Sequence, residues 1–290
     1  MFTFQNGYYM AKSDELLKLN DYQNLKAEPL YFEYLKNKGF GYSEDINELY
    51  IYQIKQLRKD LFQTLENNEV VKLFFYSIDA TNTKIIYKHI HHQTKQIIHP
   101  EGNINPQGIY NAIKHKDYSL IEDADKFIFE ALNNFSGSLK EVSEYIDILY
   151  YQRKYQLAIY KELKAYLDVE VTLKNILTVL RSYQIGSKPS LLPFGLIDEI
   201  KPLEEFIAYS SNLYIGYLAN PLKQYLQDKD LEALATAFSR DFYFILKDYT
   251  YDMSGFGIIM LYVYKKQIEL ENIKTIYYDQ DISLDKLVIL

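Results

Sequence analysis

Apolar residues recur along this chain at the spacing of amphipathic helices. The clearest case predicts a helix over 46–65, where steps of three and four separate Ile46, Tyr50, Ile54, Leu57, Leu61 and Leu65. Asn67 and Asn68 interrupt that pattern. A longer periodic stretch starts at Ser138, which can form a capping box with Glu141, and it continues to residue 167. A third stretch covers 231–246, so helical patterns occupy most of the chain.

One segment has the composition of a strand. Residues 69–78 read "EVVKLFFYSI", but helical patterns flank them and no hairpin turn follows, so a helix is predicted there too. Proline and glycine gather at 99–108 ("HPEGNINPQG") and 186–195 ("GSKPSLLPFG"), and both segments are expected to be loops. These patterns predict an all-α protein.

The chain contains one phrase three times. Residues 78–87 read "IDATNTKIIY", residues 171–180 read "VTLKNILTVL", and residues 268–277 read "IELENIKTIY". An asparagine holds the same place in each, and the loops after the first two copies match at a proline and a glycine. The residues of this repeat are Asn82, Asn175, Asn272, Pro100, Gly102, Pro193 and Gly195.

Three copies of a helical subdomain favour a pseudo-threefold body over an open solenoid. We expect one continuous domain of three lobes, at 1–116, 117–209 and 210–290. If the three asparagines are buried, each amide should bond backbone groups of an adjoining loop or helix. The alternative is that all three line a shared central surface, and the sequence leaves both open.

Composition excludes several classes of protein. The net charge is −7, and no basic cluster suggests a nucleic-acid partner. The 30 tyrosines and 16 phenylalanines suit half-buried helix faces. There is no cysteine, so disulfides and thiol chemistry are ruled out. The longest apolar run, 256–264, is too short to span a membrane. No signal peptide is visible, so we expect a soluble or peripherally attached protein.

Motifs for chemistry are weak. The phosphate-binding G-x-x-x-x-G-K-[ST] pattern and the G-x-S-x-G elbow are both missing. The acids of "IEDADK", Glu122, Asp123 and Asp125, are expected to be solvated on a helix face. No catalytic residue, cofactor or direct nucleotide binding is therefore predicted.

All five histidines fall in one part of the chain: His89, His91, His92, His99 and His115. His89 and His92 are about one helical turn apart, so they could present two imidazoles to a metal ion. That would make the protein a metal-dependent enzyme. The other interpretation, a polar helix end and a surface loop, needs no metal, and no metal site is predicted.

Several stretches together resemble one family. They are "GYYMAKSDELLKLNDYQNL", "YLKNKGFGYSE", "YIDILYYQRKYQLAIYKELKAYLDVEVTLKNILTVLRS" and "LYVYKKQIELENIKTIYY", with the phrase I-[DE]-x-x-N-[IT]-x-x-[IV] in the first and third copies. In this order and spacing, across residues 8–285, the chain resembles the C-subunit family of V/A-type rotary ATPases, whose eukaryotic equivalent is the d subunit.

The resemblance implies a fold and a role. The fold would be all-α, with three pseudo-repeated helical lobes around a pseudo-threefold axis and a funnel shape. The protein would be a non-catalytic central-stalk component on the cytoplasmic face of the membrane. It would couple the central shaft subunits (D/F type) to the membrane rotor ring (proteolipid c/K type) for ATP-linked proton or sodium transport. The alternative is a helical adaptor or scaffold of the same fold with a different partner.

Acidic residues offer one candidate docking surface. An acidic socket would attract a basic shaft tip, and the candidates are Glu204, Glu205, Asp228, Asp230 and Glu232. The alternative is that these acids stand at helix starts, where they complement the helix dipole.

Overall fold

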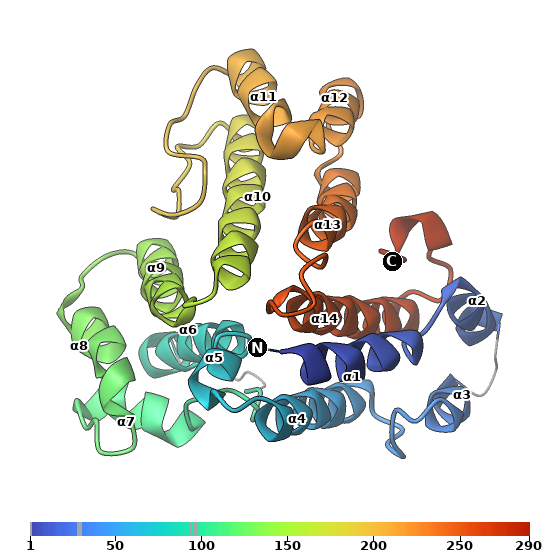
Figure 1. Cartoon of the computed structure of the whole chain (residues 1–290). Helices are drawn as coiled ribbons and strands as arrows, with labels where there is room; N and C mark the ends of the chain where they lie inside the picture. Colours follow the sequence, from blue (N-terminus) through green and yellow to red (C-terminus); the bar gives the residue numbers. More distant parts are fainter. Residues whose placement is uncertain (1, 28–30, 93, 95–97) are drawn as a thin grey trace. The chain divides into compact units, whose positions relative to one another are not determined.

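The structure is a computed structural model that describes residues 2–27, 31–92, 94 and 98–290. All regular structure in these residues is helical (Figure 1), which confirms the predicted all-α class. Among them, no helix is both long enough and apolar enough to cross a membrane. The arrangement of three lobes about an axis stays a prediction.

The α-helices are α1 (Thr3–Asp14), α2 (Leu19–Ala27), α3 (Tyr31–Asn37), α4 (Ile46–Thr64), α5 (Asn68–Lys72), α6 (Tyr76–His92), α7 (Pro106–His115), α8 (Lys126–Asn134), α9 (Leu139–Leu157), α10 (Lys161–Ile185), α11 (Leu203–Ser211), α12 (Ala219–Asp228), α13 (Leu231–Lys247) and α14 (Gly257–Tyr278), with short 3₁₀ turns at Asp123–Asp125, Leu213–Gly216 and Leu284–Lys286. The chain divides into two compact units, one of residues 1–53 and 160–290, the other of residues 54–159.

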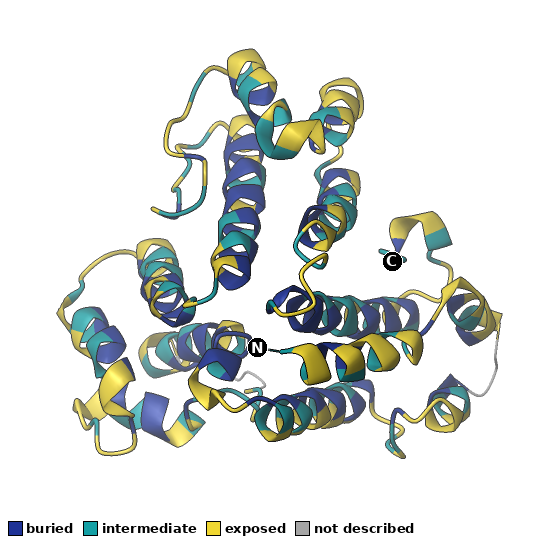
Figure 2. Cartoon of the chain, in the orientation of Figure 1, coloured by how far each residue is buried: buried dark blue, intermediate teal, exposed yellow. Residues whose placement is uncertain are grey.

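The first unit is built on two long helices, α10 and α14. α14 packs against α1, α10 and α13, and α10 packs against α13. Figure 2 shows buried residues along much of α10 and α14. The ring of Tyr9 on α1 lies 5.0 Å from that of Tyr262 on α14, centre to centre. Burial on α14 therefore comes in part from helices distant in sequence, α1 and α10.

The second unit is centred on α6, which packs against α7 and α9, while α8 packs against α7 and α9. Apolar side chains such as Ile86, Ile109 and Ile146 fill the space between these helices, each at most 3 % exposed. Ser138 and Glu141 form the predicted capping box at the start of α9. Asn67, at the predicted break after α4, accepts a bond from the Glu69 amide and caps α5.

The periodic stretch from 138 to 167 is two helices rather than one. Ala158 leaves the helical region at φ −76°, ψ 62°, and α10 begins at Lys161. The ring of Tyr160 stacks on Phe256 at 5.4 Å and meets Phe2 edge-on at 5.2 Å. The apolar spacing continues through the break because Tyr160 is packed in the first unit, so periodicity alone could not reveal it.

Candidate functional site

The repeated asparagine of the first copy ties a helix to a loop. Asn82 lies on α6 and is fully buried. Its Nδ2 donates to the carbonyl oxygen of His99 at 2.7 Å, and its Oδ1 accepts from the His99 amide at 2.9 Å. One side chain thus satisfies both main-chain groups of a loop residue 17 positions later.

The second copy has the same geometry on α10. Asn175 is 1 % exposed, donates to the Leu192 carbonyl oxygen at 3.0 Å and accepts from the Leu192 amide at 3.0 Å. Its Nδ2 also lies 3.3 Å from the Phe194 carbonyl oxygen. The sequence separation from Leu192 is again 17.

The third asparagine repeats the pattern on α14. Asn272 donates to the Val288 carbonyl oxygen at 2.7 Å and accepts from the Val288 amide at 3.2 Å, across 16 positions. We call each of these paired bonds an amide brace. The three braces share their geometry although their partners are His99, Leu192 and Val288.

The repeated proline and glycine belong to the loops that the braces hold. Pro100 and Pro193 directly follow the braced residues His99 and Leu192. A Cβ on Gly102 would overlap the Asp79 carboxylate, and one on Gly195 would lie 2.9 Å from the Thr172 hydroxyl. Gly195 also has φ +77°, where side chains are strained. These loops lie too close to their helices for a larger residue.

The residue three positions before each asparagine also accepts a hydrogen bond from a main-chain amide. In the first copy Asp79, fully buried, accepts from the amides of Asn103 at 2.9 Å and Ile104 at 3.0 Å. In the second, the Thr172 hydroxyl accepts from the Leu196 amide at 2.9 Å. No role was predicted for these positions from the sequence, although an acid on an apolar helix face was a usable signal.

In the third copy this position is Glu269, 2 % exposed. Its Oε1 accepts from the Leu17 amide at 2.7 Å, and its Oε2 pairs with Lys266 at 2.6 Å. The acceptor therefore bonds a segment that precedes it by 252 positions. The three equivalent groups are thus a carboxylate, a hydroxyl and a salt-bridged carboxylate.

Electrostatics distinguish the first copy. Burial raises the pKa of Asp79 to about 7, against the opposing effect of the two amide donors and of Arg58. The Arg58 guanidinium donates to the Asn103 side chain at 2.9 Å. The Asp79 carboxyl therefore changes protonation state near neutral pH.

A buried ion pair links α9 to the 3₁₀ turn at Asp123–Asp125 in the second unit. Arg153 on α9 donates from Nε to Asp125 Oδ1 at 2.7 Å, and the Tyr76 hydroxyl donates to the same oxygen at 2.7 Å. Asp125 is 1 % exposed, so the expectation that it is solvated is wrong. Arg153 stands on the apolar face of the 138–167 stretch. Because buried charges are normally paired, this arginine indicated that an acid would be buried beside it.

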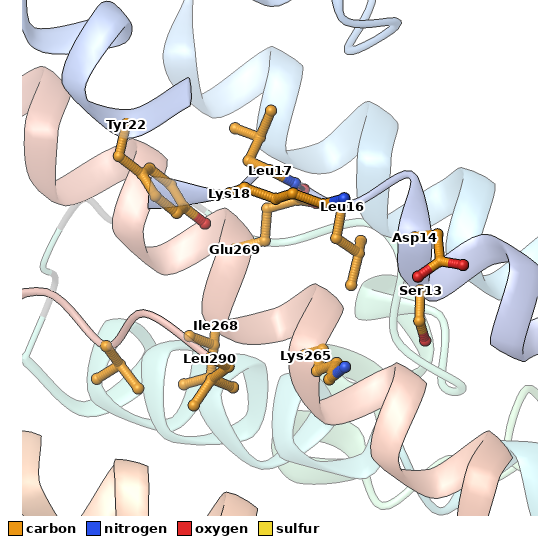
Figure 3. Close-up of a pocket in the computed structure, with 11 residues that line it drawn as sticks. Ser13, Asp14, Leu16, Leu17, Lys18, Tyr22, Lys265, Ile268, Glu269 and Leu290 are labelled. Carbon is orange, nitrogen blue, oxygen red and sulfur yellow. Dashed lines mark hydrogen bonds between the residues drawn. The ribbon is translucent and has the colours of Figure 1, made fainter. Parts of the chain in front are cut away.

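A pocket of about 240 Å³ lies in the first unit, where the segments before α2 and after α14 meet α14 (Figure 3). Figure 3 shows Glu269 turned toward Leu17 and Lys18. Lys265 lines the same pocket, and burial lowers its pKa, with Asp14 acting against that shift. The lining mixes both signs of charge with leucine side chains, so it does not select one ligand chemistry.

The histidines do not converge. The His89 ring bonds the Thr94 carbonyl oxygen at 2.7 Å, the His91 ring packs on Tyr87 at 4.3 Å, and the His99 ring accepts from the Glu101 amide at 3.1 Å. Within the described part of the chain, no three histidine or acidic side chains are placed to hold a metal ion.

Four of the five acidic docking candidates stand at helix starts, while Asp228 is the last residue of α12. Asp230 caps α13 by accepting from the amides of Glu232 at 2.9 Å and Ala233 at 3.0 Å. Glu204 and Glu205 lie in the first turn of α11. These positions favour the interpretation that the acids complement helix dipoles.

The described residues form an all-helical protein in which buried polar side chains hold loops against helices. Residues 6–278 match the model of one family, described as the ATP synthase (C/AC39) subunit. The chain therefore belongs to this family of V/A-type ATPase subunits, which confirms the resemblance found in the sequence. No curated protein matches the chain.

Proposed function

We propose that this chain is the non-catalytic central-stalk subunit of a V/A-type ATPase. In this role it couples the rotating central shaft (D/F type) to the membrane proteolipid ring (c/K type) during ATP-linked proton or sodium transport. It works on the cytoplasmic face and attaches to the membrane through the ring. The observation that carries the proposal is the family match over residues 6–278.

Physical features support a mechanical role. A protein that couples a shaft to a ring must transmit torque without local unfolding, which requires rigid loop–helix junctions. The amide braces of Asn82, Asn175 and Asn272 supply such junctions at three places. The sequence carries no phosphate-binding motif, so the proposal assigns ATP hydrolysis to other subunits.

The test is a pull-down of the tagged chain from its native cells in mild detergent, followed by mass spectrometry. We expect the shaft subunits, the catalytic subunits and the ring proteolipid to be recovered together. An untagged strain controls for background. As a second arm, the chain is co-expressed with the two shaft subunits alone, and a complex of the three is expected on size exclusion.

A clean pull-down without these subunits, from cells that contain the motor, would contradict the proposal. The chain would then be a helical adaptor that has the family fold and another partner. Zinc or iron near one ion per chain in the purified protein would instead favour the metal-dependent enzyme.

A further inference from the structure

The third copy is assembled from two distant parts of the chain. In the first copy a single loop supplies both the braced residue, His99, and the residue bonded by the acid, Ile104. In the third copy Val288, after α14, is braced by Asn272. The Glu269 carboxylate instead bonds the Leu17 amide, from the segment that precedes α2.

Leu17 holds the place that Ile104 holds in the first copy. Each donates its amide to the acid three residues before the asparagine. Each side chain is buried, with 8 % exposed for Leu17 and 5 % for Ile104. Each also lies two positions before the next helix, since α2 begins at Leu19 and α7 at Pro106.

The same segment fastens α1 to α14. At its start α1 is held by Asn6, whose Nδ2 donates to the carbonyl oxygens of Met253 at 2.8 Å and Gly255 at 2.9 Å. α1 ends at Asp14, and the Leu17 amide shortly after it donates to Glu269 on α14. Hydrogen bonds therefore hold α1 near both of its ends. Lys18 directly precedes α2, and its amide donates to the Asp21 carboxylate at 2.8 Å.

We propose that residues 16–18 are a strap that completes the third copy in place of a downstream loop and locks α1 onto α14. Glu269 is the latch of this strap, and Lys266 offsets the charge of the latch from its own helix. The strap forms one wall of the pocket in Figure 3. Its release frees the carboxyl-terminal end of α1 and opens that pocket, while the braces of the other two copies stay closed.

Hydrogen exchange of the full-length protein tests the strap, read by mass spectrometry with fragmentation that resolves single amides. The Leu17 amide should be protected in the wild type. Glu269→Ala should speed its exchange by about 10- to 100-fold, the effect of losing a bond to a charged acceptor, and leave the amides of 99–104 unchanged. Asp79→Ala should do the reverse, because it opens only the first copy.

Lys266→Met is the matched control, since it removes the ion pair but keeps the acceptor, and it should leave Leu17 protected. Exchange of the wild-type Leu17 amide at the rate of a free peptide would overturn the proposal, even if every variant failed to fold. Equal acceleration of both segments by Glu269→Ala and Asp79→Ala would also overturn it, because the copies would then not open separately.

Discussion

Replacing Asn175 by leucine removes one amide brace while nearly keeping the volume of the side chain. The variant loses the bonds to the Leu192 carbonyl and amide, both at 3.0 Å, and the contact to Phe194 at 3.3 Å. Each hydrogen bond contributes about 1 kcal/mol net, and a buried group left without a partner costs about 1–3 kcal/mol. We expect a loss of about 3 kcal/mol in the free energy of unfolding.

Urea denaturation followed by circular dichroism measures this loss. The midpoint should fall with little change in slope, because the surface exposed on unfolding stays nearly the same. The melting temperature should fall by about 5 °C for a chain of this size. Asn134→Leu is the control, because Asn134 is exposed and bonds the Glu130 carbonyl of its own helix.

Two results would refute this reasoning. An unchanged midpoint for Asn175→Leu would mean that the loop around Leu192 is held by its other contacts. A loss no larger than that of Asn134→Leu would mean that the brace contributes nothing, because leucine is the better helix former and propensity cannot cause a loss.

Buried contacts give three further predictions. Gly102→Ala should lower the melting temperature because its methyl group would overlap Asp79, whereas Gly7→Ala, with open space around it on α1, should be neutral or gain up to about 1 kcal/mol. Because burial raises the pKa of Asp79 to about 7, the folded chain holds a proton that the unfolded chain releases. Stability from this group should therefore fall as pH rises from 5 to 7, and Asp79→Asn should remove about 2 kcal/mol of that fall in urea titrations at the two pH values. Arg153→Leu should cost about 3–5 kcal/mol in urea unfolding, because the buried Asp125 carboxylate would lose its charged partner and keep only the Tyr76 hydroxyl. A double variant with Asp125→Asn that is no more stable than the single one would contradict this account.

Local patterns in the sequence predicted local structure well. The capping box of Ser138 and Glu141 depends on residues three apart, so it could be read directly and is confirmed. The helical class followed from periodicity and is also confirmed. The break before α10 was missed because the packing of Tyr160 depends on Phe2 and Phe256, which are distant in sequence.

Contacts between distant segments explain the other gaps. The acid of the repeated phrase was visible, but Asp79 and Glu269 bond different segments, one downstream and one far upstream. No pattern within the phrase could identify Leu17 as a partner. Asp125 was misjudged for the same reason, since its burial depends on Arg153 in another helix.

The amide brace recognises peptide groups and ignores side chains. Its three partners are an imidazole, an isobutyl and an isopropyl residue, and the bonds are the same in each case. Any residue except proline can occupy the braced position without loss of a bond, because only proline lacks the amide hydrogen. The side chain at a braced position is therefore set by its surroundings and not by the brace: Leu192 is buried, Val288 lines the pocket, and the His99 ring bonds the Glu101 amide.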